Sequence, residues 1–349
     1  MKIAITADPE LPVPPLHYGG IERVIDMLVR SLVERGHDVT LFAHRNSRPP
    51  CRLVPWSGAS SLSRADTIRN AATLGNAVLL GRYDLVHSFS RIAYMVPILP
   101  LPIPKLMTYQ RAISRRSVQL GHLLSRGTLQ FTAISRWMMR EVEDIGAWHL
   151  VYNGVPLATF DFKASVAPDA PLAFLGRVEE IKGPHIAIEV AKRTGTPLII
   201  AGNIPNEYKG WFEANIAPHV DDRLIRYVGP VNDKQKNALL GSARALLMPI
   251  LWEEPFGIVM AEAMACGTPV IGFRRGAVPE VVTHGENGYV VDTVEELAAA
   301  VAGVGAIDRA KVRQRCEAHF SDHVIASNYE KIYRSLIGAE IGQAAALAN

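Results

Sequence analysis

Short apolar segments that alternate with amphipathic helical patterns constrain the fold of this 349-residue chain more than any other feature. In the first half of the chain, five such segments predict β-strands: Lys2–Thr6, Val39–Ala43, Leu85–His87, Lys105–Thr108 and Phe131–Ala133. Between the first two, apolar residues from Ile21 to Leu32 recur at the spacing of one helix face, and Gly36 suits the end of that helix. Strands that alternate with helices in this way predict an α/β fold with a parallel sheet.

The same pattern begins again after a polar, proline-containing stretch around Asp161–Pro171. Five more segments predict strands: Leu172–Leu175, Leu198–Ala201, Ile225–Val228, Ala245–Met248 and Val270–Gly272. A last helical pattern covers Asp322 to Ile337. We therefore predict two Rossmann-like domains, residues 1–160 and 161–320, followed by a helical segment and tail at 321–349. Ligands in such folds bind at the carboxyl ends of the strands, which predicts a central cleft between the two sheets.

Charge is distributed unevenly along the chain. Residues 1–160 hold 18 basic and 11 acidic side chains, whereas residues 161–349 hold 19 basic and 23 acidic ones. The excess is concentrated around Arg111, Arg115, Arg116 and Arg126. A solvated basic face explains this cluster, and a surface for a phosphorylated acceptor or an anionic lipid explains it as well. Nucleic acid is not expected, because the cluster lacks interleaved aromatic residues and matches no DNA- or RNA-binding motif.

The three cysteines, Cys51, Cys266 and Cys316, are too scattered for a zinc site and too few for a disulfide framework. The N-terminal residues lack the apolar core of a signal peptide. The longest apolar stretch, Ala93 to Pro104, contains four prolines and is too short to cross a bilayer. These features predict a cytoplasmic protein and leave open a peripheral contact with the inner face of the membrane.

The densest chemical signal is a pair of glutamates, Glu254 and Glu262. Pro255 or Phe256 suits the first turn of a helix and Gly267 suits its end. Glu254 would then lie beside the free amides of the helix start, about 12 Å along the axis from Glu262. That separation matches the distance from a sugar ring to a ribose across a diphosphate. Two solvated glutamates are the alternative, which the apolar surroundings of Glu262 disfavour.

Two further loops follow predicted strands. Arg177 and Lys182 flank the loop after the strand at Leu172–Leu175, where two cations could neutralise a diphosphate leaving group. Gly19 and Gly20 precede the first helix, where glycines let backbone amides approach a phosphate or a sugar. Each loop alone is a weak signal, since arginine, lysine and glycine are common in surface turns.

Taken in order, these motifs resemble the family 4 retaining glycosyltransferases, whose architecture of two Rossmann-like domains is called GT-B. The resemblance spans nearly the whole chain and rests on an ordered set of segments: Tyr18-Gly19-Gly20-Ile21-Glu22-Arg23, Thr132-Ala133-Ile134-Ser135, Val151-Tyr152-Asn153-Gly154-Val155, Gly176-Arg177 with Lys182-Gly183, Glu254-Pro255-Phe256-Gly257 through Glu262-Ala263, and Pro279-Glu280-Val281 with Asn287-Gly288. It implies a glycosyltransferase that acts with retention on a UDP- or GDP-linked sugar and uses no other cofactor. The acceptor would be bound by the N-terminal domain, onto which the final helix would cross back.

The resemblance also implies roles for single residues. Arg177 and Lys182 would bind the donor diphosphate, Glu254 would face the transferred sugar, and Glu262 would bind the ribose. The remaining donor-site candidates are the amides of Phe256, Gly257, Ile258 and Val259, the base-binding positions Tyr227, Val228 and Gly229, the N-terminal glycines Gly19 and Gly20, and Asn203. The chain contains no Asp-x-Asp pair, which predicts transfer without a metal ion.

One position departs from the family pattern. Members of the family usually carry a histidine just after the strand that corresponds to Lys105–Thr108, and here Gln110 takes that place as the second catalytic candidate beside Glu254. Glutamine can form a hydrogen bond, but it cannot carry a proton. Either a hydrogen bond is sufficient, or His87 or His17 substitutes, or activity is reduced. On sequence grounds, His87 is by default a structural histidine.

The sequence was also compared with the patterns of other protein classes that share an α/β fold. A nicotinamide-dependent dehydrogenase would need Gly-x-Gly-x-x-Gly directly after a strand, which the first strand lacks, and no Gly-Lys-Ser/Thr loop of a nucleoside triphosphatase occurs. Within the GT-B architecture, a sugar-nucleotide epimerase or a phosphorylase is the nearer alternative. Gln110 motivates a third one, a non-catalytic or weakly active protein that binds sugar nucleotides. The acceptor, an unidentified hydroxyl compound that could be anionic or lipid-linked, and the oligomeric state are not readable from the sequence.

Overall fold

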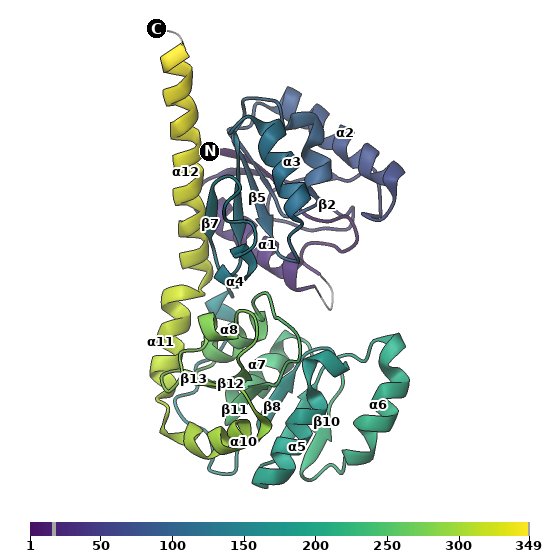
Figure 1. Cartoon of the computed structure of the whole chain (residues 1–349), viewed down its shortest axis with the longest axis vertical. Helices are drawn as coiled ribbons and strands as arrows, with labels where there is room; N and C mark the ends of the chain where they lie inside the picture. Colours follow the sequence, from purple (N-terminus) through teal and green to yellow (C-terminus); the bar gives the residue numbers. More distant parts are fainter. Residues whose placement is uncertain (16–18, 348–349) are drawn as a thin grey trace. The chain divides into compact units, whose positions relative to one another are not determined.

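The computed structural model describes the backbone of residues 1–15 and 19–347. Side chains are described for residues 1–15 and 19–338. The chain forms two compact units (Figure 1). Unit 1 comprises Met1–Asn153 together with the segment that starts at Asp322, and unit 2 comprises Gly154–Ser321. Unit 2 thus begins at Gly154, whereas the sequence pattern predicted a boundary near residue 160. Val155 belongs to unit 2 because its backbone N–H donates a hydrogen bond of 2.8 Å to the carbonyl oxygen of Phe320, near the end of that unit.

A seven-stranded parallel sheet forms the centre of unit 1, in the order β3-β2-β1-β4-β5-β6-β7. The strands are β1 (Lys2–Thr6), β2 (Asp38–Ala43), β3 (Arg52–Pro55), β4 (Leu85–Ser88), β5 (Lys105–Tyr109), β6 (Leu129–Ala133) and β7 (Trp148–Leu150). The strand order reverses between β1 and β4, which is where ligands bind in doubly wound sheets.

Helices cover both faces of this sheet, because successive residues of a buried parallel strand point to opposite faces. Ile3 and Ile5 belong to a core shared with the first and last helices, whereas Ala4 belongs to a second core on the other face. The helices of unit 1 are α1 (Gly20–Glu34), α2 (Arg64–Gly81), the 3₁₀ helix η1 (Ile92–Ile98), α3 (Arg115–Ser125), α4 (Arg136–Met139) and α12 (Asp322–Leu347).

The last helix, α12, is part of unit 1 although it follows unit 2 in the sequence. It runs along unit 1 (Figure 1) and packs beside α1. Tyr329 and Tyr333 lie in the sheet core. A buried hydrogen bond of 2.6 Å joins the Tyr333 hydroxyl to Nδ1 of His87, and Glu330 pairs with Arg35 at 2.6 Å. Apolar packing and buried polar contacts therefore hold α12 on the N-terminal sheet.

A six-stranded parallel sheet forms the centre of unit 2, in the order β10-β9-β8-β11-β12-β13. Its strands are β8 (Leu172–Leu175), β9 (Leu198–Ala201), β10 (Ile225–Tyr227), β11 (Ala245–Met248), β12 (Val270–Phe273) and β13 (Gly288–Val291). Its α-helices are α5 (Pro184–Thr194), α6 (Lys209–Asn215), α7 (Asp233–Ser242), α8 (Ile258–Ala265), α9 (Val278–Val281), α10 (Val294–Gly303) and α11 (Arg309–His319). Short 3₁₀ helices occur at Leu157–Thr159, Glu180–Lys182, Asn206–Tyr208, Ala217–His219 and Val304–Ala306. The order reverses between β8 and β11, as in unit 1.

All ten predicted strands are present, and three further strands, β3, β7 and β13, were missed. β3 and β7 lie at sheet edges and are partly exposed, so their sequences lack a continuous apolar run. β13 begins with a glycine that follows an asparagine, a pair that indicates a turn. The predicted final helix is present as α12 and extends beyond Ile337 to Leu347.

Candidate functional site

Most candidate residues of unit 2 lie in the segments that follow its strands, at the carboxyl edge of the sheet, whereas Ile258, Val259 and Glu262 lie on α8. The loop after β8 ends at Gly183, which adopts a left-handed conformation with φ 75°. A Cβ atom at this position would lie 2.0 Å from the carbonyl oxygen of Pro249, in the loop after β11. Only glycine allows the two loops to approach so closely. Pro184 then starts α5.

This approach brings Lys182 and Glu254 together. Lys182 Nζ lies 2.7 Å from Glu254 Oε2, and the indole Nε1 of Trp252 donates to the same oxygen at 3.0 Å. The ammonium group also lies 4.6 Å from the centre of the Trp252 ring. Both side chains of the ion pair are mostly buried, at 19% and 12% exposure. The sequence placed both residues near a ligand but did not predict that they pair.

Arg177 and Asn203 lie in the loops that follow β8 and β9. Arg177 Nη2 lies 2.8 Å from Oε1 of Glu179, whose carboxylate is buried. The Asn203 carbonyl accepts a hydrogen bond of 2.9 Å from Val178 N, so the β9 loop is fastened to the Arg177 loop. Glu179 was not a candidate from the sequence, although its place between two cations was a signal for it.

Glu262 lies on α8 and forms a second ion pair that the sequence analysis missed. Its partner is Lys236, on α7, whose Nζ is in direct hydrogen-bond contact with Glu262 Oε1. Glu262 and Lys236 are exposed by only 8% and 11%, and Asp233 lies 3.4 Å from Lys236 Nζ on the solvent side. A buried carboxylate requires such a partner. That requirement was a usable signal, because it predicts a cation on a neighbouring helix.

The start of α8 corrects the sequence prediction. The helix begins at Ile258 and not at Pro255 or Phe256, because Gly257 is left-handed (φ 74°) and caps it. Glu254 therefore lies in the preceding loop, where its carbonyl accepts a hydrogen bond of 2.8 Å from Ala277 N. The predicted separation of about 12 Å assumed one continuous helix from Glu254 to Glu262, and this assumption does not hold.

The rest of this segment has a clear division of roles. The Phe256 side chain is buried and packs on Phe320, with ring centres 5.7 Å apart, so only its backbone could face a ligand. Ile258 and Val259 supply the first two amides of α8, and the N-terminus of a helix favours anions. The end of the helix follows the prediction, with Gly267 left-handed just beyond it.

The base-binding candidates are Tyr227, the last residue of β10, and the two residues that follow it, and β10 pairs with β9. The Tyr227 hydroxyl donates to the Gly202 carbonyl at 2.8 Å, and burial raises the pKa of that hydroxyl. Val228 is half exposed, and Gly229 is left-handed with φ 73°. The Gly229 carbonyl accepts a hydrogen bond of 2.9 Å from Gly202 N. Tyr227 and Gly229 thus join the loops after β9 and β10.

Three of the predicted residues belong to unit 1. Gly19 precedes α1 with φ 154°, and a Cβ there would lie 2.7 Å from Pro15 Cβ, so the position requires glycine. Gly20 opens the helix. Gln110 follows β5 and is buried, with its side-chain amide in two reciprocal hydrogen bonds of 2.8 Å with the side chain of Asn153.

The histidines offered as substitutes for a catalytic histidine differ in what the structure says of them. His87 is fully buried, with Nδ1 bonded to Tyr333 and Nε2 2.6 Å from Thr108 Oγ1. Burial lowers its pKa to about 3. It is the structural histidine that the sequence suggested, and both of its ring nitrogens are occupied. His17 lies outside the described residues.

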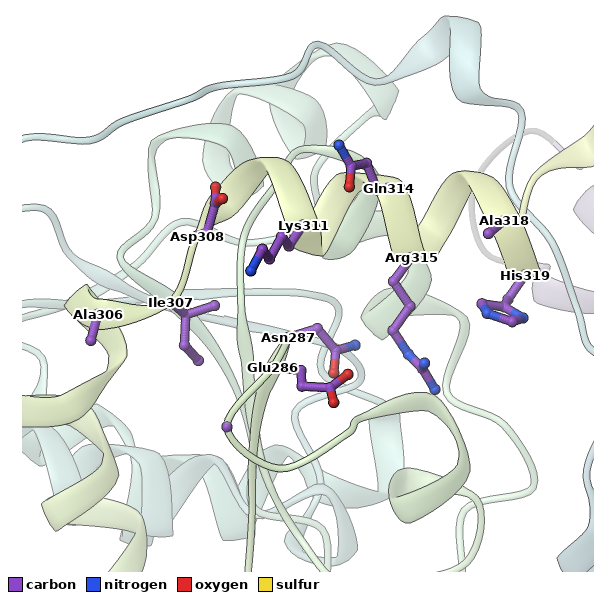
Figure 2. A pocket seen from close by; sticks show the side chains of 11 residues that line it. Glu286, Asn287, Ala306, Ile307, Asp308, Lys311, Gln314, Arg315, Ala318 and His319 are labelled. Atoms are coloured by element: carbon purple, nitrogen blue, oxygen red, sulfur yellow. The ribbon is translucent and has the colours of Figure 1, made fainter.

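A cavity of about 580 Å³ in unit 2 is separate from these residues. It lies between α11 and the loop before β13, and Figure 2 shows Lys311, Arg315 and His319 along the helix. Arg315 donates to the carbonyl oxygens of Val281 and Glu280 at 3.3 and 3.4 Å, which satisfies the end of α9. Because the loop precedes β13, the cavity lies at the amino end of that strand, away from the candidate residues.

Among residues 1–15 and 19–338, whose side chains the structure describes, no group of three or more His, Cys, Asp or Glu side chains is arranged to hold a metal ion. Within the same part of the chain, every helix is too short or too polar to cross a lipid bilayer.

Comparison with known proteins identifies the family. A family model described as "Glycosyltransferase Family 4" matches residues 18–159, and one described as "Glycosyl transferases group 1" matches residues 170–305. The chain belongs to this glycosyltransferase family. The two matches follow each other along the chain and cover most of both units.

Relatives of this glycosyltransferase include the "Glycogen synthase" of Mycobacterium tuberculosis, at 28% identity, with 92% of each chain covered. The "Phosphatidyl-myo-inositol mannosyltransferase" of Mycolicibacterium smegmatis is 25% identical, with 98% of this chain and 95% of the relative covered. Among solved structures, Anabaena Alr3699/HepE in complex with UDP-glucose superposes with a TM-score of 0.73 at 17% identity, covering 96% of this chain and all of that one. The predicted fold class is confirmed: each unit is a Rossmann-like, parallel-sheet domain of the GT-B architecture.

Proposed function

We propose that this glycosyltransferase moves a sugar from a nucleoside-diphosphate sugar to a hydroxyl acceptor, with retention of anomeric configuration and without a metal ion. The observation that carries the proposal is the row of charged groups at the carboxyl edge of the unit 2 sheet. This row comprises Arg177 and the pair Lys182–Glu254, in the loops that follow β8 and β11, and the pair Lys236–Glu262, which joins α7 to α8. Cations suit a diphosphate, and carboxylates suit sugar and ribose hydroxyls.

Each residue of this row has a distinct proposed role. Lys182 has three N–H donors, and its bond to Glu254 occupies one of them, so it can hold a phosphate oxygen at the same time. Arg177 and the first amides of α8 would take the remaining phosphate charge. Glu254, fixed by Lys182 and Trp252, would accept hydrogen bonds from the transferred sugar. Glu262 would accept them from the ribose. The comparison structure that contains UDP-glucose supports a UDP-linked donor, and a GDP-linked donor is the alternative.

The chemical step needs no protein nucleophile in this proposal. The bond from the anomeric carbon to the leaving phosphate oxygen breaks while the acceptor oxygen attacks from the same face. The acceptor proton passes to the leaving phosphate, which the cations stabilise as it gains charge. Support for retention comes from the family resemblance. The anomeric proton couplings of the isolated product, measured by NMR, test it, and an inverted product would refute it.

Gln110 is the proposed contribution of unit 1 to the reacting sugar. Its amide is oriented by Asn153, which leaves a hydrogen-bonding but not a proton-transferring role. The glycines Gly19 and Gly20 would bring backbone close to the donor. Both roles rest on the family resemblance.

We further infer that the enzyme works in the cytoplasm and contacts the inner face of the membrane peripherally. The support is α3, which exposes Leu120 and Leu123 by 55% and 73% within a segment that also carries Arg116 and Arg126. Such a surface suits anionic lipids, and an anionic or lipid-linked acceptor agrees with it. Flotation with vesicles that contain phosphatidylglycerol tests the contact. Equal recovery with neutral phosphatidylcholine vesicles would contradict it.

The test of the central proposal is nucleotide release from a panel of UDP- and GDP-linked sugars. The wild type is compared with Glu254→Ala and with Glu286→Ala, an exposed glutamate away from the row. We expect release from at least one donor, lost in Glu254→Ala and kept in Glu286→Ala. If no donor binds to the wild type, the proposal is wrong. If a donor binds with equal affinity to wild type and Glu254→Ala and no acceptor supports turnover, the chain is a sugar-nucleotide-binding protein. Conversion of the donor sugar without transfer would indicate an epimerase.

A further inference from the structure

The loop after β8 contains a buried carboxylate, that of Glu179, to which the proposed transfer assigns no role. The Glu179 side chain is 3% exposed, whereas that of its ion-pair partner, Arg177, is 34% exposed. Arg177 Nη2 lies 2.8 Å from Glu179 Oε1, yet this oxygen accepts no hydrogen bond in the part of the chain that the structure describes. The contact is therefore one of charge rather than an aligned hydrogen bond. Carboxylates are seldom buried, because their desolvation is costly.

Hydrogen bonds of the main chain, and not the carboxylate, hold the shape of this loop. Glu179 N donates to the Arg177 carbonyl at 3.0 Å, and Lys182 N donates to the Glu179 carbonyl at 3.1 Å. Val178 N donates to the Asn203 carbonyl at 2.9 Å, which fastens the loop to the one after β9. A neutral side chain at position 179 would keep all three bonds. What the carboxylate adds to the site is therefore a negative charge.

Each cation of the proposed diphosphate site has its own carboxylate. Lys182 pairs with Glu254 at 2.7 Å, as Arg177 does with Glu179 at 2.8 Å. The remaining pair of the row, on α7 and α8, is balanced in the same way. Glu180 is exposed, so its charge is screened by salt. A diphosphate that binds the two cations of the β8 loop thus also meets two carboxylates. Glu254 has a proposed contact with the sugar, whereas Glu179 is too deeply buried for one.

The distance from Glu179 to a bound phosphate decides how strongly its charge acts. A phosphate oxygen on the far side of the Arg177 guanidinium would lie within about 8 Å of the carboxylate, because each N–H···O contact spans about 3 Å. That distance does not exceed the Debye length of about 8–10 Å at 0.1–0.15 M salt. At an effective permittivity of about 20, two unit charges so placed change a binding constant about thirtyfold. With partial screening, an effect of about fivefold or more remains.

The donor and the released nucleotide differ in charge. In a sugar donor the terminal phosphate is esterified, whereas in free UDP or GDP it has a second pKa of about 6 and carries nearly one more negative charge at neutral pH. Surplus positive charge in the site therefore strengthens the binding of the product more than that of the donor. A carboxylate beside Arg177 has the opposite effect and lowers the affinity for the product most.

We propose that Glu179 is a specificity-determining residue of this site, which offsets the charge of Arg177 so that the enzyme releases the nucleoside diphosphate after transfer. This inference rests on the proposed function and adds to it a control of product affinity. Glu179 acts through its charge and contacts neither the donor nor the product.

Titration calorimetry of the full-length enzyme with UDP and with uridine tests the inference, and GDP and guanosine replace them if the donor is GDP-linked. Glu179→Gln should lower the Kd of UDP at least fivefold and change that of uridine less than twofold, because uridine has no phosphate. Glu180→Gln, which removes an exposed charge from the next residue, is the matched control and should change the Kd of UDP less than twofold. An unchanged or higher Kd of UDP in Glu179→Gln would overturn the inference. A wild type that binds neither UDP nor GDP refutes the proposed function itself, so the two failures are distinguishable.

Nucleotide release from the sugar donor supplies a readout that a change in folding would not produce. The measured constants are the KM of the donor and the inhibition constant of added UDP. In Glu179→Gln the inhibition constant should fall by a larger factor than the KM, and kcat should not rise, because the more tightly held product leaves more slowly. Equal factors for donor and product, or a higher kcat with an unchanged inhibition constant, would overturn the inference.

A second neutral variant, Glu179→Ala, is measured in case the first is unstable, which urea unfolding shows. It also lacks the charge and should likewise lower the Kd of UDP. Raising KCl from about 50 to about 300 mM should weaken UDP binding more in either variant than in the wild type, since screening acts on a cation that is no longer offset. If both variants bind UDP more weakly than the wild type, Glu179 serves only to hold Arg177 in place, and the inference is overturned.

Discussion

Replacing Lys236 with methionine tests whether the Lys236–Glu262 ion pair stabilises unit 2. The change leaves a carboxylate that is 8% exposed without its cation. Removing one partner of a buried pair costs about 3–5 kcal/mol, and the slight exposure favours the lower end, about 3 kcal/mol. Glu262→Gln should cost less, about 1–2 kcal/mol, because Lys236 keeps Asp233 at 3.4 Å as a partner. The double variant, which has neither charge, should be within about 1 kcal/mol of wild type.

Hydrogen exchange of the β11 and β12 amides measures the free energy of opening unit 2 without a contribution from unit 1. Lys234→Met, an exposed lysine on the same helix, is the matched control and should change this free energy by less than about 0.5 kcal/mol. If the two single effects add to within about 0.5 kcal/mol in the double variant, the groups do not interact and the reasoning fails.

Lys236→Met also tests how the donor nucleotide binds. If Glu262 binds the ribose, its carboxylate must be held in place by Lys236, and Lys236→Met should weaken UDP more than 2′-deoxy-UDP. Titration calorimetry gives both dissociation constants. A loss of affinity that is the same for the two nucleotides would place Lys236 at the diphosphate or in the fold and not behind the ribose.

Four further outcomes are expected. Gly183→Ala should destabilise unit 2 by about 3 kcal/mol, because alanine there combines backbone strain with a clash. The control is Gly195→Ala, at a glycine that is also left-handed but has open space around it, and it should cost about 1 kcal/mol. Urea unfolding measures both values. Burial lowers the pKa of His87 to about 3, whereas a histidine in the unfolded chain has a pKa of about 6.5, so below pH 6.5 the unfolded chain binds more protons than the folded one. The free energy of unfolding should therefore decrease by about 2 kcal/mol as the pH is lowered from 6.5 to 5. His87→Asn should lack this part of the decrease when unfolding is measured at both pH values. Arg177→Met should weaken UDP binding at least tenfold and uridine binding little in calorimetry, and equal losses would argue against a diphosphate contact. Gln110→Ala should lower kcat of transfer at least tenfold with an unchanged donor dissociation constant; an unchanged kcat would remove it from the reacting site.

The sequence predicted strands and loops best where one residue type is required by local geometry. Gly36 after the first helix and Gly267 after the apolar helix marked helix ends correctly, because few other residues adopt a left-handed conformation. The preference of proline for the first turn of a helix misplaced the start of α8, because the left-handed Gly257 lies between Pro255 and the first helical residue, Ile258. Edge strands were missed because half-exposed strands have no continuous apolar run.

Pairings between distant residues were beyond the reach of the sequence. Lys182 is 72 positions from Glu254, and Gln110 is 43 positions from Asn153. No local pattern encodes such contacts, which form only when parallel strands bring their carboxyl ends to one edge. A buried carboxylate does, however, require a cation, and this requirement could have pointed from Glu262 to a lysine such as Lys236.

By itself, the sequence determined the α/β class, the two repeated sheets, the family and the candidate donor residues, because periodicity and short glycine-containing motifs are local properties. The tertiary structure alone decided which cations pair with which carboxylates, that His87 is held between β5 and α12, and that the carboxylate of Glu179 is buried. These facts depend on burial, and burial is set by how sheets and helices pack. Whether a charged group is paired or exposed to water is therefore decided by the fold.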